Sequence, residues 1–160
     1  PSQFDFYSGG GLDIAFLGFG EIDAVGNVNV SKLGGNTVGP GGFIDIAQNA
    51  RKVVFCGTFD TGGARTEVGS GVMRVTEHGR ISKLVDKVDQ ITFSGPQSLL
   101  QGQKVIYITE RAVFELRENG LHIIEIAPGI DLQTDLLDRM GFVPNMNSPL
   151  SEMDSNYFKK

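Results

Sequence analysis

A run of glycines directly in front of an apolar stripe is the first feature of this sequence that could do chemistry. Three of the four residues at positions 39–42 are glycines, and the fourth is Pro40. Because glycine has no side chain, the backbone here can approach a ligand closely. A helix beginning at Phe43 would also turn unpaired N–H groups and a partial positive charge toward this segment. The pattern predicts a pocket for a negatively charged oxygen. Since proline has no N–H, the donors of this pocket would be the N–H groups of Gly39, Gly41, Gly42 and Phe43.

A tight turn that lets a helix pack closely on a sheet would require similar glycines, so it remains an alternative explanation. A dinucleotide-binding loop is disfavoured, because the order here is G-P-G-G rather than G-x-G-x-x-G and no acidic residue follows at the usual spacing. A P-loop is excluded, because no Gly-Lys-Ser/Thr follows the glycines.

The elements around the glycine run follow the order of an α/β protein. Apolar residues recur at positions 43, 46, 47 and 50, which is the spacing of a helix that buries one face. Residues 53–56 are all apolar, which is typical of a strand covered on both sides. Further core strands are expected at 12–17 and 104–109. We therefore predict an α/β fold with a mixed, largely parallel sheet, flanked by helices and carrying β-hairpin insertions.

Turn-forming residues predict three hairpins. The first covers residues 20–31, with a turn at 25–27 and polar residues on an exposed face. The second covers 72–81, and the third covers 112–126 around the dipeptide Asn119-Gly120. Between strand 53–56 and the second hairpin, residues 57–64 are expected to form a flexible polar loop. Such a loop at the carboxyl end of a strand lies where open α/β sheets bind ligands.

A last helix is predicted from Asp131 to Met140, capped by Asp131 and ended by Gly141. After it, the chain shows no periodicity. We place a single domain at residues 1–142 and an irregular tail at residues 143–160.

Other reactive side chains have structural explanations. Cys56 ends an apolar strand with no histidine nearby, so we interpret it as a small core residue. His78 and His122 are interpreted as surface or sheet residues, and two isolated histidines predict no metal site. Glu110 follows a core strand, where it could take part in chemistry, pair with Arg111 or cap the backbone.

Composition restricts the function further. The chain has 160 residues and a formal charge of −5, from 14 Lys and Arg against 19 Asp and Glu. Without a basic cluster, nucleic acid is not an expected partner. No segment approaches the roughly 20 apolar residues that span a membrane, and a single cysteine favours a cytoplasmic location.

Three motifs, in this order, resemble the C-terminal, β-subunit-like part of family I CoA-transferases, especially those acting on acetate or propionate. The resemblance extends from about Phe4 to Met140. The motifs are FDFYSGGGLDIAFLG at 4–18, GPGGFID at 39–45 and ITERAVF at 108–114.

The resemblance implies transfer of CoA between short-chain carboxylic acids, with acyl-CoA as substrate and no other cofactor. In this family a glutamate attacks the thioester and becomes a glutamyl-CoA thioester. Gly41 and Gly42 would then form the oxyanion hole. The residues expected to contact CoA or the acyl group are Val38, Gly39, Phe43, Thr61, Gly62 and Gly63.

The family's nucleophilic glutamate lies in an E-x-G-x-x-G-G segment before the first motif, and this sequence lacks that segment. We therefore expect the chain to be an N-terminally incomplete fragment, inactive alone, that requires the upstream half of the enzyme and forms a homo-oligomer. An acyl-CoA hydrolase of the same family and a non-catalytic metabolite-binding or assembly module of the same fold are the alternatives.

Overall fold

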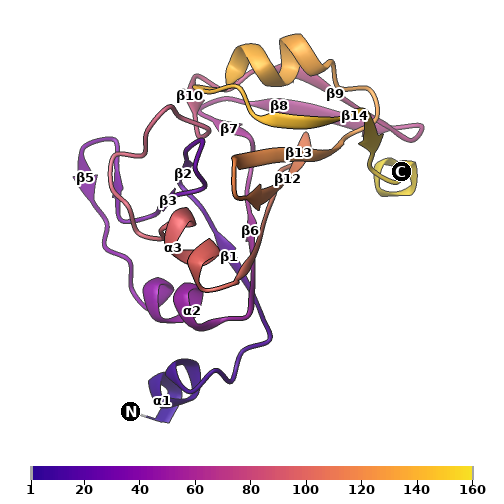
Figure 1. Ribbon diagram of the computed structural model, residues 1–160. Coiled ribbons are helices and arrows are strands. Elements are labelled where there is room, and N and C mark those ends of the chain that lie inside the picture. The colour runs from indigo at the N-terminus through magenta and orange to yellow at the C-terminus, as the bar shows by residue number, and fades with distance from the viewer. Residues whose placement is uncertain (1, 160) are drawn as a thin grey trace.

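The computed structural model describes residues 2–159 and is built around one six-stranded sheet (Figure 1). Its strand order is β1-β6-β11-β12-β13-β14. The first three strands are parallel, β12 is antiparallel to both β11 and β13, and β14 is parallel to β13. The strands are β1 (Ile14–Gly18), β6 (Lys52–Cys56), β11 (Lys104–Ile108), β12 (Ala112–Arg117), β13 (Gly120–Ile126) and β14 (Asn145–Glu152). The predicted mixed, largely parallel α/β fold is confirmed.

The centre of the sheet follows from the apolar run at 53–56. Val53, Val54 and Phe55 in β6 are all buried, because β1 and β11 pair with the two edges of β6. The Phe55 ring stacks on Phe43 at 5.8 Å and on Tyr107 at 5.3 Å between ring centroids. These aromatic contacts hold the helix that follows the glycine run against the sheet.

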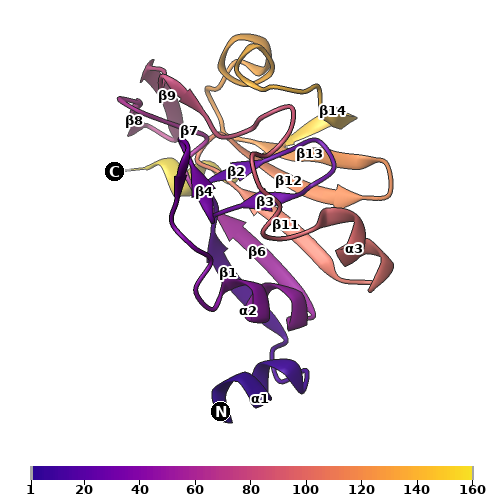
Figure 2. The same ribbon diagram turned by 90° about the vertical axis from the view of Figure 1, so that its left-hand side faces the viewer.

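Three short helices accompany the sheet: α1 (Ser2–Ser8), α2 (Phe43–Asn49) and α3 (Gly95–Leu100). Helix α2 buries Phe43 and Ala47 as its spacing predicts. The Gln103 side chain donates to the carbonyls of Ala47 and Ala50 at 2.7 and 2.6 Å, so it holds the end of α2 against the sheet. Helix α1 stands apart from the sheet, below α2 in both views (Figures 1 and 2).

One face of the parallel strands is open. Ala15, Val53 and Val105 are aligned neighbours on β1, β6 and β11, and all are buried. On the opposite face, Phe16 is 66% exposed and Ile108 is 37% exposed. Cys56 is also exposed, so its interpretation as a core residue is wrong. It lies on this open face, aligned with Gly18 and Ile108.

The prediction of a hairpin at residues 72–81 is wrong. Instead β8 (Arg65–Gly69) pairs with β9 (Val72–Glu77), and the turn between them lies at Ser70-Gly71. Both turn residues have positive φ, 55° and 81°, as a tight hairpin turn requires. Segment 57–64 is not simply a polar loop, since it contains β7 (Asp60–Thr61), which pairs with β10 (Ile81–Ser82).

The other two hairpins are present. Strands β12 and β13 form the predicted hairpin around Asn119-Gly120. Strands β2 (Glu21–Ile22) and β3 (Val28–Asn29) form the first, but its polar residues are not on an exposed face. Asn29 is fully buried and donates to the Glu21 carboxylate at 2.7 Å. A further hairpin, β4 (Lys32–Leu33) with β5 (Asn36–Thr37), follows.

The C-terminal part is more ordered than its sequence suggests. Asp131 caps a helical segment as predicted, since its carboxylate accepts from the N–H groups of Gln133 and Thr134. The segment is one π-helical turn, Leu132–Leu136, followed by a 3₁₀ turn, Leu137–Arg139, rather than one α-helix. Arg111, which is distant in the sequence, donates a hydrogen bond to the Asp135 carbonyl in this segment at 3.1 Å.

The tail expected to be irregular contains β14 and a 3₁₀ turn at Ser155–Phe158. Strand β14 forms because β13 offers it a free edge, and Phe158 is buried against the core. The division of the chain at residue 142 remains a prediction.

Candidate functional site

The glycine run forms a bent, exposed segment in front of α2. Gly39 and Gly41 have φ values of 83° and 54°, which side chains rarely adopt. The Gly39 N–H donates to the Ser31 carbonyl at 3.1 Å, and the Phe43 N–H donates to the Pro40 carbonyl at 3.1 Å. Two of the four predicted donors are therefore occupied. Within residues 2–159, the N–H groups of Gly41 and Gly42 have no hydrogen-bond partner.

Gly42 is not required by the packing of this chain. Its φ of −82° and ψ of 3° are those of the third residue of a type I turn, which most residues other than proline adopt, and a Cβ built on it would meet no described atom within 4 Å. Gly41 also faces open space. The absence of side chains thus leaves room beside two free N–H donors, as binding of a ligand oxygen there would require.

The other predicted residues divide into two groups. Val38 is 69% exposed beside the glycines, whereas the Phe43 ring lies in the core against Phe55. Phe43 therefore anchors the loop through its ring. Thr61, Gly62 and Gly63 lie at the end of β7, where Arg80 donates from its backbone N–H and its Nε to the Gly62 carbonyl, at 3.4 and 3.1 Å.

A cavity of about 360 Å³ lies near the carboxyl ends of β1 and β6. This is the edge where open α/β sheets bind ligands. Four separate segments of the chain line it, and it includes Thr61 but none of residues 38–43. The lining residues are Phe19, Gly20, Glu21, Leu33, Gly34, Thr58, Thr61, Ile81, Ser82 and Lys83.

Two glycines shape this cavity. A Cβ on Gly20 would lie 2.5 Å from Leu33. A Cβ on Gly57 would lie 2.8 Å from Phe19 and 3.0 Å from the Lys83 ammonium. Neither position could carry a side chain without displacing the cavity wall.

Lys83 is the basic residue of the cavity lining. Its ammonium lies 4.0 Å from the centroid of the Phe19 ring, where the ring attracts a cation. Burial lowers the pKa of Lys83, while the nearby Glu110 carboxylate acts in the opposite direction. Among the described residues, Lys83 forms no ion pair within 4 Å. Sequence reasoning did not identify this lysine, because it lies in a polar stretch with no motif.

A buried charge cluster lies behind the strand ends. Arg111 is fully buried, donates to Asp60 at 2.8 Å and lies over the Phe59 ring at 4.6 Å. Glu110 pairs with Arg111 at 3.3 Å and accepts from the Phe59 N–H at 2.8 Å. Both structural explanations of Glu110, the ion pair and the backbone cap, are confirmed.

The two histidines have neighbouring partners. His78 lies 3.3 Å from Arg111 and 3.4 Å from Asp135, and His122 lies 2.6 Å from Asn119. Burial lowers the pKa of both imidazoles. In the described part of the chain, no group of three or more His, Cys, Asp or Glu side chains could hold a metal ion. None of its helices is long and apolar enough to cross a membrane.

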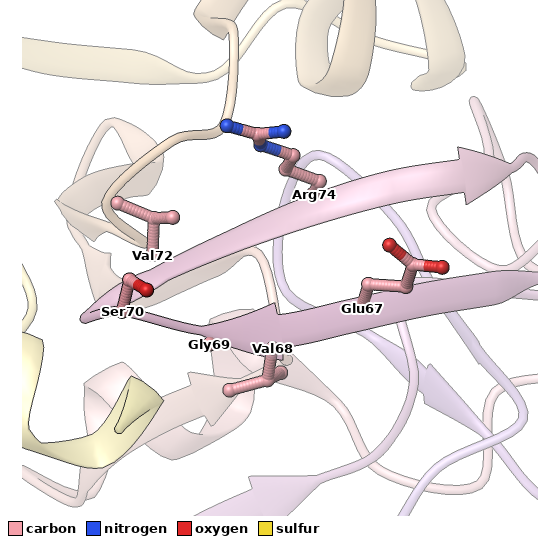
Figure 3. Close-up of a pocket in the computed structure, with 6 residues that line it drawn as sticks. All are labelled: Glu67, Val68, Gly69, Ser70, Val72 and Arg74. Atoms are coloured by element: carbon pink, nitrogen blue, oxygen red, sulfur yellow. The ribbon is translucent and has the colours of Figure 1, made fainter. Parts of the chain in front are cut away.

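A second hollow, of about 370 Å³, lies along the β8–β9 hairpin (Figure 3). Figure 3 shows Glu67 and Arg74 projecting to the same side of the two strands, with Val68 pointing the other way. The hollow is open, and all six residues that line it come from this one hairpin or its turn. The four-segment cavity and the glycine run are therefore the stronger candidates for a site.

No family model matches the chain. It is 51% identical over 157 residues to the acetate CoA-transferase YdiF of Escherichia coli O157:H7, covering 98% of this chain and 30% of that protein. It is 47% identical over 164 residues to the caffeate CoA-transferase of Acetobacterium woodii, and this match covers 99% of this chain and 31% of that protein. The crystal structure of YdiF from E. coli O157:H7 as a thioester complex with CoA matches with a TM-score of 0.96 at 51% identity, over 98% of this chain and 31% of that one.

The chain therefore spans about 30% of the length of the curated relatives it matches. These similarities confirm the resemblance to CoA-transferases that the three sequence motifs indicate.

Proposed function

We propose that this chain is part of a CoA-transferase that moves CoA between short-chain carboxylic acids. The observation that carries the proposal is the 51% identity to an acetate CoA-transferase over almost the whole chain. The second relative is named for caffeate, an aromatic acid. The size of the acyl group is therefore part of the test below.

The glycine run supports a role in acyl transfer. When a carboxylate attacks a thioester, the carbonyl oxygen gains negative charge, and N–H donors aimed at that position stabilise it. We assign this role to the N–H groups of Gly41 and Gly42, which are exposed and have no partner in the described chain. The attacking glutamate lies in the part of the enzyme that precedes this chain.

In the proposed reaction the glutamate forms a mixed anhydride and CoA leaves as thiolate. The thiolate then attacks the glutamyl carbonyl, which releases the first acid and forms the glutamyl-CoA thioester. The acceptor carboxylate attacks that thioester, and the same two steps run in reverse to give the new acyl-CoA and the free glutamate. Each attack creates an oxyanion. Coenzyme A is a substrate here, and no other cofactor is required.

The remainder of the enzyme is the proposed partner of the open sheet face. Phe16 and Ile108 leave apolar surface there, and relatives of this chain are about three times its length. We propose that the preceding part of the enzyme covers this face in a cytoplasmic enzyme that assembles as a homo-oligomer. The single cysteine supports that compartment.

The test of the reaction uses the full-length enzyme with acetyl-CoA and a second acid, either propionate or caffeate. We expect CoA exchange between acids, and a mass increase on a glutamate equal to CoA minus water. Hydrolysis of acetyl-CoA to acetate and free CoA, without exchange between acids, would indicate the hydrolase alternative. If acyl-CoA did not bind and a sugar phosphate did, the non-catalytic module would be correct.

The test of the oxyanion assignment is Gly42→Ala in the same enzyme. Alanine fits the backbone at this position and meets no described atom, so stability should not fall. The methyl group would instead occupy the space beside the donors. Because this displaces the reacting oxygen by about 1 Å, we expect kcat to fall on the order of 10²-fold. Gly69→Ala is the matched control, because this position also faces open space but lies on the β8–β9 hairpin. Equal activity of the two variants would refute the assignment.

A further inference from the structure

The four-segment cavity has the chemistry of a site for a small organic anion. Its volume of about 360 Å³ lies at the lower end of the roughly 300–1,000 Å³ typical of ligand pockets. Apolar side chains of Phe19, Leu33 and Ile81 form part of its lining, and Lys83 supplies a positive charge. Thr58 and Thr61 also line it, and their hydroxyl groups make no hydrogen bond among residues 2–159.

The charge of Lys83 is held in place but is not neutralised by direct contact. Phe19 lies under its ammonium at 4.0 Å. The Glu110 carboxylate, which acts electrostatically on Lys83, is already bonded to the Phe59 N–H at 2.8 Å and paired with Arg111 at 3.3 Å. A half-buried ammonium without an ion pair is stabilised when an anion enters the cavity, because the anion replaces part of the hydration that the ammonium has lost.

The lining favours a monoanion over a phosphate. Glu21 also faces the cavity, and its Oε2 accepts from Asn29 at 2.7 Å and from the Asp89 N–H at 3.0 Å. The fixed Glu21 carboxylate would repel a doubly charged group, such as a phosphate of CoA, more strongly than a singly charged one. A single carboxylate attached to an apolar chain is repelled less, and its chain matches the apolar part of the lining.

We propose that Lys83 binds the carboxylate of the free acid substrate and that the apolar wall of the same cavity holds its chain. This inference rests on the proposed function for the identity of the acid, but the anion site itself does not. Lys83 is then a substrate-binding residue that acts before the acid attacks the thioester. Gly57 is its support, because a side chain at this position would displace both Phe19 and the ammonium.

The kinetic test compares Lys83→Met with Lys87→Met in the full-length enzyme. Lys87 is exposed, lies four residues further on and does not line the cavity. Loss of a charge-assisted hydrogen bond should raise KM for acetate or butyrate on the order of 10-fold or more. KM for acetyl-CoA should stay within about twofold, and Lys83→Arg should recover part of the loss. Unchanged KM for the acid in Lys83→Met would overturn the proposal.

A second measurement does not depend on turnover. The enzyme is treated with a water-soluble acetylating reagent that reacts with amines. Modification of Lys83 and Lys87 is followed by peptide mass spectrometry with and without butyrate. Butyrate should slow modification of Lys83 several-fold and leave Lys87 unchanged. Protection by CoA but not by butyrate would overturn the carboxylate assignment. Protection by butyrate in an enzyme without exchange activity would keep the anion site and reject the transferase function.

Discussion

The guanidinium of Arg111 lies 2.8 Å from the Asp60 carboxylate, and their side chains are 0% and 5% exposed. This pair joins the start of β12 to β7, two elements separated by about fifty residues. Arg111 also donates to the Asp135 carbonyl at 3.1 Å. One buried side chain therefore ties β7, which leads into Thr61–Gly63, to the C-terminal helical segment.

Removing Arg111 should be strongly destabilising. Arg111→Met leaves the Asp60 carboxylate buried without its cation, and such a change costs about 3–5 kcal/mol in the free energy of unfolding. Urea unfolding followed by circular dichroism measures this value. Arg51→Met is the control, because its partner Asp13 and Arg51 itself are largely exposed. This variant should lose less than about 1 kcal/mol. Equal losses in the two variants would show that the buried pair contributes no more to the free energy of unfolding than the exposed pair.

Acid should destabilise the protein through His78. Burial, and then the charges of Arg139 and Arg111, lower its pKa, while Asp135 and Asp60 oppose them only in part. The unfolded chain therefore binds a proton at this site more readily than the folded protein. The free energy of unfolding should fall as the pH drops below the ordinary imidazole pKa of about 6.5.

The measurement is urea unfolding at pH 7.5 and pH 5.5 for wild type and His78→Gln. The variant should lose less stability between the two pH values. His122→Gln should behave in the same direction, because burial also lowers the pKa of His122. An unchanged pH dependence in the double variant would contradict the assignment of this effect to the histidines.

The sequence specified the centre of this fold but not its periphery. Four consecutive apolar residues at 53–56 were enough to predict a central strand, and Val53, Val54 and Phe55 are buried in it, whereas Cys56 at its end is exposed. The glycine run predicted four N–H donors, and within residues 2–159 those of Gly41 and Gly42 are free while those of Gly39 and Phe43 are occupied. Strand β8 was missed, because Arg65, Thr66 and Glu67 are exposed and carry no apolar alternation.

The cavity could not have been predicted in the same way. Its lining brings together Phe19, Leu33, Thr61 and Lys83 from four segments, and each contributes through pairing that depends on the whole fold. The short pair β7 and β10 illustrates this, because it places Thr61 opposite Ile81 through only two residues on each side. No local pattern in either segment indicates that partner.

The hairpin turn at Ser70 offers a stabilising substitution. Ser70 is the one described residue other than glycine with positive φ, at 55°. Asparagine adopts this conformation more readily than serine, and Asn-Gly is the preferred pair for such a turn. Ser70→Asn should therefore raise the free energy of unfolding by about 0.5 kcal/mol, whereas Ser70→Val should lower it. Thermal unfolding of both variants decides the sign, and a lower Tm for Ser70→Asn would contradict the prediction.

The open sheet face should make this chain self-associate when the part of the enzyme proposed to cover it is absent. Phe16 is 66% exposed on β1, and Ile14 and Ile108 are 42% and 37% exposed on the same face, so its ring belongs to an apolar surface. Phe16→Lys places a charge there and should shift the chain toward the monomer in sedimentation velocity at increasing concentration. Tyr157→Lys is the control, since Tyr157 is 76% exposed in the C-terminal 3₁₀ turn. A monomeric wild-type chain at every concentration, or equal dissociation by both variants, would rule out this face as the contact.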